Sequence, residues 1–516
     1  MSEHKRIVIV GGVAGGASAA ARSRRLSESA EIIVFERGEH VSFANCGLPY
    51  HIGGEIEERE KLLMHTPESL LARFHIDARV RHEVVSVDCA KHEVIVRNLD
   101  SGEVFQQGYD NLILSPGAEP IVLPIAGARS DRVLTLRNMA DMDAINSVLD
   151  EKQPTEAVVV GGGYIGLEMV EALYNRGLKV TLVELAEQVM GAADAEMVSP
   201  LQQELVLRGI NLRLGTSASE ILVNGDGSDK LRVCLDNGET INCGLVVMAV
   251  GVRPETTLAR DAGLKIGKLG GILVDDHMRT SDPDIYAVGD AVEVKDFLSN
   301  VQSLIPLAGP ANRQGRIAAD NVFGRQSTYK KTQGTAICKV FNLGIGMTGL
   351  SEKALKKLGI AHEKIYVHPF SHAGYFPGAS PVSLKLLFDP NDGRILGAQA
   401  VGAGGIDKRI DILAIAIRAG LSVFDLEEFE LSYAPPYGSA KDVVNYAGFV
   451  ASNVLRGDVR LCHCEDIFDL KADQELLDVR DDEEVAAGTI EGAVHVPVDQ
   501  LRNRLDELSK DKEWLL

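Results

Sequence analysis

Cys46 is the first residue in this chain whose type and setting could do chemistry. It lies in residues 41–50, Val-Ser-Phe-Ala-Asn-Cys-Gly-Leu-Pro-Tyr, shortly after a glycine-rich loop. Sulfur chemistry runs through the thiolate, and a cysteine with a pKa near 8.5 is only about 3% ionised at neutral pH. A reactive Cys46 therefore needs help, which backbone amides at a helix start could supply. Alone, this segment leaves open the alternative of a small, buried apolar residue.

The residues before Cys46 form a dinucleotide-binding pattern. A buried strand at 6–10 leads into the glycine loop at 11–16, an Ala-rich helix at 17–26 and a second strand at 32–35 that ends at an acid. Glycines let the backbone approach a pyrophosphate at a helix N-terminus, and the acid suits a ribose hydroxyl. One departure is a valine at the middle glycine position. The cofactor-binding candidates here are Gly11, Val13, Ala14, Gly15, Gly16, Glu36 and Arg37.

The helix after this loop carries a cluster of arginines, namely Arg22, Arg24 and Arg25. Such a cluster usually forms a solvated helix face. Because it lies close in sequence to Cys46, it could instead bind the phosphates of a large anionic thiol. Both interpretations stay open at this point.

A second and complete dinucleotide pattern begins at residue 157. A strand at 157–160 leads into the G-x-G-x-x-G loop at 161–166, a helix at 165–176 and a strand at 179–183 that ends at Glu184. An acid there binds a 2′-hydroxyl and repels a 2′-phosphate, so NADH is expected over NADPH. Residues 248–254 are expected to close this domain with a strand and a turn. The candidates are Gly161, Gly163, Tyr164, Ile165, Gly166, Glu184 and Gly251.

Composition narrows the class of protein. A length of 516 residues predicts about three domains. A net charge of −21 argues against general binding to nucleic acid or an anionic membrane. The seven cysteines do not form a secreted disulfide framework, no apolar stretch is long enough to span a membrane, and residues 1–6 run into a strand without a signal-peptide core. A cytoplasmic protein without membrane insertion is therefore expected.

Two dinucleotide folds in one chain suggest a flavin and a hydride donor. Together with Ser115-Pro116-Gly117 and the segment 280–290, which ends in Gly289-Asp290 at an expected helix start, the two loops resemble the FAD- and NAD-dependent pyridine nucleotide-disulfide reductases. The resemblance implies an α/β fold with two Rossmann-like domains, in which the NAD domain interrupts the FAD domain. The implied limits are 1–150 and 271–330 for the FAD domain and 151–270 for the NAD domain. Ser115, Gly117, Gly289 and Asp290 join the FAD-binding candidates.

Members of that family with a redox disulfide carry two cysteines four residues apart, whereas this chain has only Cys46 there. Cys89, the next cysteine, lies on an expected alternating strand and favours a core position. The segment Ser-Phe-Ala-Asn-Cys-Gly-Leu-Pro-Tyr resembles the coenzyme A-disulfide reductases. NADH oxidases and peroxidases share its Ser-Phe-x-x-Cys part and use a sulfenic acid.

The coenzyme A reductase resemblance also implies a substrate site. Ser18, Arg22, Arg25, Ser42, Asn45 and Lys441 fall where that group contacts coenzyme A. Phe74 stands where a relative has a basic contact, with Arg73 beside it, and Asn312 replaces a histidine. Tyr375 and Tyr433 match tyrosines that reach the partner subunit's active site, where they are expected to act with Cys46 in catalysis.

The rest of the chain is expected to form an α+β dimerisation domain at 331–455, a linker at 456–470 and a partial rhodanese-like α/β domain at 471–516. Cys462-His463-Cys464 suggests a metal site, but three adjacent ligands cannot all face one ion comfortably, so no metal is predicted. The rhodanese resemblance lies in residues 477–480 and 488–497, and a following strand is expected from 512. A rhodanese cysteine would come after that strand, so either the sequence is truncated or this module does not transfer sulfur.

The sequence thus predicts a homodimeric flavoenzyme that uses NADH and FAD to reduce coenzyme A persulfide, polysulfide or coenzyme A disulfide through Cys46. Coenzyme A would be either substrate or tightly bound cofactor, and the rhodanese-like segment favours a persulfide or polysulfide. Two alternatives remain: an NADH oxidase or peroxidase with a Cys46 sulfenic acid, and a non-catalytic redox sensor. Consumption of oxygen or peroxide would indicate the oxidase or peroxidase. Loss of turnover with every acceptor would indicate the sensor.

Overall fold

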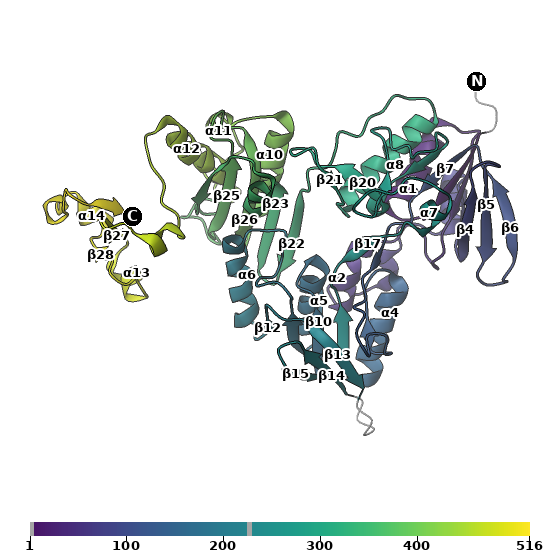
Figure 1. Cartoon of the computed structure of the whole chain (residues 1–516), viewed down its shortest axis with the longest axis horizontal. Coiled ribbons are helices and arrows are strands. Elements are labelled where there is room, and N and C mark those ends of the chain that lie inside the picture. Colours follow the sequence, from purple (N-terminus) through teal and green to yellow (C-terminus); the bar gives the residue numbers. More distant parts are fainter. Residues whose placement is uncertain (1–4, 224–229) are drawn as a thin grey trace. The chain divides into compact units, whose positions relative to one another are not determined.

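The first glycine loop follows the central strand of a five-stranded parallel sheet in this computed structural model, which describes residues 5–223 and 230–516 (Figure 1). Residues 1–4, part of the N-terminal segment in which no signal-peptide core was expected, lie outside that range. In spatial order the strands are β19 (Ile285–Ala287), β7 (Asn111–Leu114), β1 (Arg6–Val10), β2 (Glu31–Phe35) and β3 (Asp77–Arg79). Since β19 follows the whole second sheet in sequence, the predicted interruption of one Rossmann-like domain by another is confirmed.

Two helices cover one face of this sheet in close contact: α1 (Ala14–Leu26) and α8 (Ala308–Val322). They meet at a glycine pair, because a Cβ added to Gly315 would lie 2.2 Å from the carbonyl oxygen of Gly15. Helix α1 begins at Ala14, three residues before the predicted start. The backbones of these helices therefore touch where larger side chains would separate them.

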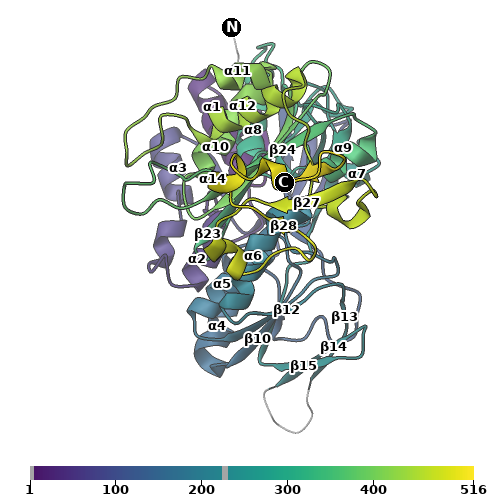
Figure 2. The ribbon, with the colours of Figure 1, turned by 90° about the vertical axis from the view of Figure 1, so that its left-hand side faces the viewer.

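The second glycine loop follows the central strand of another parallel sheet. Its strands are β12 (Asn211–Arg213), β11 (Lys179–Val183), β10 (Glu156–Val160), β16 (Leu245–Met248) and β9 (Val133–Leu134). Helix α5 (Tyr164–Asn175) connects β10 to β11. Figure 2 shows three antiparallel strands beside β10 and β12, namely β13 (Ala218–Val223), β14 (Leu231–Leu235) and β15 (Thr240–Cys243). The strand–loop–helix–strand order predicted from the sequence is therefore present twice.

A five-stranded antiparallel sheet follows, with α10 (Ile406–Ala419) packed on it. Its strands are β22 (Ala336–Val340), β23 (Leu343–Gly349), β26 (Ile395–Gly402), β25 (Val382–Phe388) and β24 (Glu363–Val367). Buried side chains of the second parallel sheet, such as Val159, and of this sheet, such as Val340 and Ile345, belong to one continuous core. Burial of this apolar surface holds the two regions together.

A buried ion cluster links the same two regions. The Lys385 side chain on β25 is fully buried, and its ammonium contacts carboxylates of Asp194, Glu196 and Glu352. Asp194 precedes α6 (Ala195–Leu207) and also accepts a backbone N–H at 3.0 Å from Glu352, the first residue of α9 (Glu352–Leu358). These carboxylates could group around a metal ion, but the Lys385 ammonium already contacts all three, and Lys364 also pairs with Glu352 at 3.1 Å.

The residues from 449 onward form a separate unit that contains the rhodanese-like segment. Its parallel strands are β28 (Val494–His495), β27 (Gln474–Asp478) and β29 (Glu513–Leu515). Arg480 and Thr489 both donate hydrogen bonds to the Asp478 carboxylate, at 2.7 and 2.8 Å. The strand expected from 512 is thus present as β29.

Replacing Lys385 with methionine should strongly destabilise the unit formed by the residues before 449. The three carboxylates that contact the Lys385 ammonium would lose their common partner. We expect a loss of about 3–5 kcal/mol, measured as the shift of the first transition in denaturant unfolding. Lys357→Met, at an exposed position on α9, is the matched control and should change stability by less than about 0.5 kcal/mol. Equal stability of the two variants would show that the cluster does not hold these regions together.

Candidate active site

Cys46 lies in a 3₁₀ turn, Asn45–Gly47, directly before α2 (Leu48–Ile52). Its thiol is exposed and lies 3.8 Å from the Asn45 side-chain oxygen, to which it donates a weak hydrogen bond. The interpretation of Cys46 as a buried apolar residue is therefore wrong. Cys89 lies just after the end of β4 (His82–Asp88) rather than on a strand, but its half-buried side chain packs against the core of the first domain as expected.

One cavity of about 960 Å³ brings Cys46 together with both nucleotide-binding regions. Its lining combines predicted residues from the first domain, from the cysteine segment and from the second loop. The predicted residues that line it are Ala14, Asn45, Cys46, Gly161, Gly163, Tyr164, Ile165, Glu184, Gly251 and Asp290. Among the described residues of this lining, Cys46 is the only cysteine.

The first glycine loop is built for close backbone contact. Gly11 has φ +91°, and a Cβ there would lie 2.1 Å from the Ser115 carbonyl oxygen. The Glu36 carboxylate accepts backbone N–H groups of Gly12 at 2.9 Å and Gly38 at 2.8 Å. Gly16 packs against the Gly11 carbonyl, which brings α1 up to the strand end. The loop therefore fits the tight turn that a bound dinucleotide requires.

The second loop repeats this geometry. Gly161 has φ +107°, Gly166 packs against its carbonyl, and Glu184 accepts the backbone N–H of Gly162 at 2.6 Å. A Cβ added to Gly163 would meet nothing within 4 Å, so this side of the loop is open. Open space beside a helix N-terminus fits the approach of a pyrophosphate.

Asp290 comes from the distant segment after β19. As expected, a short strand leads to a helix start at Asp290, and this helix is a single 3₁₀ turn, Gly289–Ala291. Burial raises the pKa of the Asp290 carboxyl, against the opposing charge of Arg137, whose guanidinium lies 3.6 Å away. Gly289 donates its N–H to buried Gln314 at 2.8 Å. These groups offer polar partners to a polyol or phosphate chain.

Two further FAD-binding candidates lie next to this region. Gly117 has φ +78°, and a Cβ there would lie 2.6 Å from the Arg137 guanidinium. Arg37 is largely exposed and lies 3.7 Å from Glu255. Val13 precedes α1 and does not cap it with a side-chain hydrogen bond.

The surroundings of Cys46 do not favour its thiolate in the nucleotide-free chain. Cys46 is open to the cavity, but the protein atoms around it remove part of its hydration, and this desolvation raises the pKa of the thiol. The nearby carboxylates of Glu168 and Asp290 raise it further, while Arg137 opposes them. The expectation that backbone amides at a helix start ionise this cysteine is therefore not met, because α2 is only five residues long and the dominant effects act the other way. Ionisation depends on what binds beside Cys46.

Sequence reasoning missed Glu168, which lines the same cavity from α5. Burial raises the pKa of its carboxyl to about 7, although a hydrogen bond at 3.3 Å from the Tyr50 hydroxyl acts against this. The sequence did contain a signal for Glu168. It lies one helical turn after Tyr164 and therefore shares a helix face with a residue that was predicted to bind the cofactor.

The candidates for coenzyme A contacts lie on α1, α3 (Pro67–Phe74) and α8 and in loops, and only Asn45 among them lines this cavity. Ser18 donates to Asn312 at 2.8 Å, and Arg22 pairs with Asp320 at 2.6 Å. Arg25 and Arg73 are exposed, and Ser42 adopts φ +52°. Arg24, by contrast, is buried and binds five backbone carbonyls, which gives it a structural role.

The predicted catalytic tyrosines are not near Cys46 within one chain. Tyr375, Tyr433 and Lys441 line an open cavity of about 700 Å³ that shares no lining residue with the cavity of Cys46. The two hydroxyls lie 2.9 Å apart, and this hydrogen bond raises the pKa of Tyr375. The Lys441 ammonium lies 5.6 Å from the centre of the Tyr446 ring.

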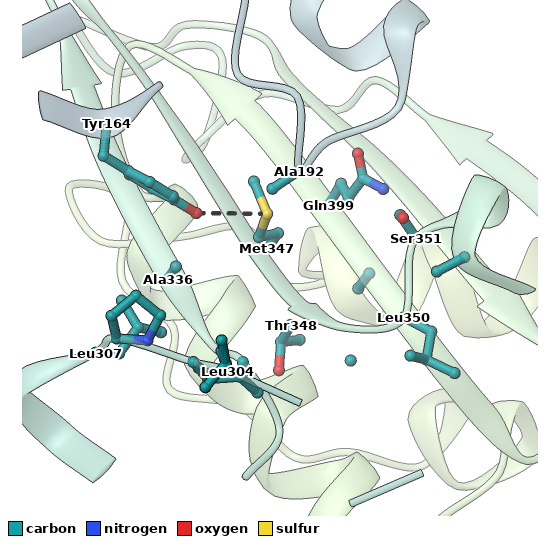
Figure 3. A pocket seen from close by; sticks show the side chains of 16 residues that line it. Tyr164, Ala192, Leu304, Leu307, Ala336, Met347, Thr348, Leu350, Ser351 and Gln399 are labelled. Carbon is teal, nitrogen blue, oxygen red and sulfur yellow. Dashed lines mark hydrogen bonds between the residues drawn. The ribbon is translucent and has the colours of Figure 1, made fainter. Parts of the chain in front are cut away.

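A smaller chamber of about 340 Å³ adjoins the cavity of Cys46, because both are lined by Tyr164, Leu304 and Leu307. Figure 3 shows the Tyr164 hydroxyl directed at Met347, to whose sulfur it donates at 3.7 Å. Leu304 and Leu307 lie along one side and Gln399 along the other. Tyr164 thus borders both cavities.

Comparison with known proteins assigns the family. Residues 5–315 match the family model "Pyridine nucleotide-disulphide oxidoreductase", residues 335–442 its dimerisation domain, and residues 465–516 a rhodanese-like domain. The chain belongs to the pyridine nucleotide-disulphide oxidoreductase family. Membership confirms the predicted oxidoreductase class. Among the described residues, no helix is long and apolar enough to cross a membrane.

Three proteins of known name are similar to this chain over most of its length. Coenzyme A disulfide reductase of Staphylococcus aureus strain JH9 is 37% identical over 447 residues, which are 86% of this chain and 99% of that protein. The crystal structure of reduced Bacillus anthracis CoADR-RHD is 47% identical, with a TM-score of 0.95 over 99% of this chain and 92% of that one. A NAD-dependent persulfide reductase from A. fulgidus is 35% identical, with a TM-score of 0.92 over 99% and 93%. The resemblance predicted from the sequence is confirmed.

Removing the charge of Glu168 should make Cys46 more reactive in the nucleotide-free protein. Because the carboxylate raises the pKa of the thiol, Glu168→Gln should lower it and speed alkylation at neutral pH by about threefold. The pH dependence of Cys46 alkylation, followed by mass spectrometry, measures this. Glu187→Gln, at an exposed position, is the control. A pKa that is unchanged or higher in Glu168→Gln would contradict the assigned electrostatics.

Proposed function

We propose that this protein uses NADH and FAD to reduce coenzyme A persulfide, a polysulfide or coenzyme A disulfide through Cys46. The observation that carries the proposal is the shared cavity, in which one accessible thiol lies with residues of two dinucleotide loops. With one cysteine in that lining, the sulfur partner of Cys46 has to arrive from outside. The named relatives support the same reaction class.

The chemistry balances for a coenzyme A persulfide. The Cys46 thiolate attacks the coenzyme A sulfur, which forms a mixed disulfide and releases hydrosulfide. Two electrons from NADH then cleave the mixed disulfide and return the Cys46 thiolate and coenzyme A. With one proton taken up, the products are coenzyme A, hydrogen sulfide and NAD⁺. The first glycine loop, Glu36 and Asp290 would hold FAD, which would supply the two-electron carrier between nicotinamide and sulfur.

Cations near α1 are the proposed binding site for the anionic part of coenzyme A. Arg25 and Arg73 are exposed and can take phosphates directly, whereas Arg22 would have to share its charge with Asp320. Ser18, Ser42, Asn45, Asn312 and Lys441 are proposed as further contacts. The rhodanese-like segment, together with the persulfide reductase among the relatives, favours a persulfide or polysulfide as the natural acceptor.

The active protein is proposed to be a homodimer. Residues 335–442 match a dimerisation domain, and the tyrosine cavity of one chain does not meet the cavity of Cys46. Tyr375 and Tyr433 of one subunit would then donate a proton to the sulfur that leaves at Cys46 of the other. A cytoplasmic location, without nucleic-acid partners, stays a prediction from charge and cysteine content.

Replacing Cys46 with serine should abolish NADH-driven release of hydrogen sulfide from coenzyme A persulfide while FAD stays bound. A hydroxyl cannot form the mixed disulfide, so the loss should exceed about 1,000-fold. Cys89→Ser is the control, because Cys89 is half-buried away from the cavity. Sulfide release that survives in Cys46→Ser would exclude the mechanism, and NADH-dependent oxygen or peroxide consumption without sulfide release in the unaltered protein would favour an oxidase or peroxidase.

Mixing the Cys46→Ser chain with a chain that lacks the two tyrosine hydroxyls, and is therefore slowed, should raise activity if the tyrosines act across the dimer. A heterodimer of Cys46→Ser and a Tyr375→Phe/Tyr433→Phe chain has one site with every group intact. Random exchange of subunits should therefore give about a quarter of the normal sulfide release per subunit. The variants assayed separately are the controls. Mixtures no more active than their components would place the tyrosines and Cys46 in the same subunit.

A further inference from the structure

Arg409 on α10 is a buried arginine that none of the proposed chemistry uses. Its side chain is 1% exposed, and that of its partner Asp442 is 2% exposed. The guanidinium donates to both Asp442 carboxylate oxygens, at 3.1 and 2.7 Å, and to the carbonyls of Gly405 at 2.9 Å and Ser371 at 2.7 Å. Four hydrogen bonds from one planar group fix its position tightly.

These contacts join the two loops that carry the tyrosines. Ser371 begins the loop that reaches Tyr375, and Asp442 ends the loop that starts at Tyr433. The loops are also joined by a backbone hydrogen bond of 3.0 Å, from the Ala373 N–H to the Gly438 carbonyl. Arg409 therefore lies at the common base of both loops.

The tips of the same loops have little support of their own. Tyr375 is 76% and Tyr433 49% exposed, and the bond between their hydroxyls joins them at the tip. Exposed side chains keep several rotamers unless their backbone is held, so a fixed separation of the hydroxyls has to come from the base.

Asp442 has several hydrogen-bonding and charged partners besides Arg409. Its buried carboxylate would therefore stay paired if Arg409 were replaced. The Lys408 ammonium lies 3.6 Å away, and the Val444 N–H at the start of α12 (Val443–Arg456) donates to the carboxylate at 3.2 Å. The Asp442 N–H in turn donates to the Asn445 side chain at 3.0 Å. A change at Arg409 would thus release Ser371 and Gly405 while Asp442 keeps other partners.

We propose that Arg409 is a positioning residue that sets the Tyr375–Tyr433 pair by tying both loops to α10. The inference rests on the proposed function, in which that pair acts at the partner subunit's Cys46. It adds a residue outside both cavities, since Arg409 lines neither of them.

A mutant cycle on the full-length holoenzyme tests this. In Arg409→Lys the charge stays, but a single ammonium cannot reach all four acceptors, so sulfide release should fall about tenfold. Reduction of bound FAD by NADH should stay unchanged, because it uses the other cavity. In a Tyr375→Phe/Tyr433→Phe background the same change should have no further effect, because the groups that Arg409 positions are gone. Equal losses in both backgrounds would overturn the inference.

A second readout does not depend on turnover. The Tyr433 hydroxyl raises the pKa of Tyr375, so misplacement of the loops should let Tyr375 ionise at lower pH. The difference in tyrosinate absorbance between Arg409→Lys and Arg409→Lys/Tyr375→Phe isolates that group. If Tyr375 ionises at the same pH in Arg409→Lys as in the unaltered protein, Arg409 does not position it. This conclusion holds even if the protein releases no sulfide.

Two further variants guard against a general loss of folding. Asp442→Asn keeps the size of the side chain. It should also lower the pH at which Tyr375 ionises, by less than Arg409→Lys does. Arg418→Lys makes the same change on the same helix, at a residue that contacts Phe297 rather than the tyrosine loops, and should leave turnover and Tyr375 ionisation unchanged. A Tyr375 shift of equal size in Arg418→Lys would reduce the role of Arg409 to general helix stability and contradict the proposal.

Discussion

Hydride transfer from a nicotinamide to a flavin and attack of a thiolate on sulfur each require the reacting atoms to be in contact, and this constraint decides the architecture. Each dinucleotide needs its own parallel sheet, so two strand ends with their glycine loops have to open onto one cavity. The shared core between Val159 and Val340 and the ion cluster around Lys385 keep the second sheet against the antiparallel sheet. The wall of the cavity is thus assembled from three regions, and its shape depends on interactions far from Cys46.

Both dinucleotide folds could be predicted because their signals are local. Strand periodicity, glycine spacing and the terminal acids Glu36 and Glu184 located each βαβ unit to within a few residues. The interruption of one fold by the other needed the resemblance, since nothing local ties β19 to β7. The residue contacts of the site, by contrast, could not be assigned, because Arg137, Glu168 and Asp290 come together only through tertiary packing.

The electrostatics of Cys46 illustrate the same limit. From sequence, the turn before α2 suggested a thiolate stabilised by backbone amides. In the fold, Glu168 and Asp290 lie close enough to favour the thiol instead. Arg22, which looked free to bind phosphate, already pairs with Asp320. Sequence order gives the residue types near a site, but the balance of their charges depends on distances that only the fold sets.

The contact between Gly15 and Gly315 has a consequence for the proposed coenzyme A contacts on these two helices. Because the backbones of α1 and α8 approach so closely there, any side chain at position 315 would push the helices apart. Ser18 on α1 and Asn312 on α8, whose side chains are joined by a hydrogen bond of 2.8 Å, depend on that spacing. Two glycines that touch no ligand themselves therefore set the separation of two residues proposed to bind it.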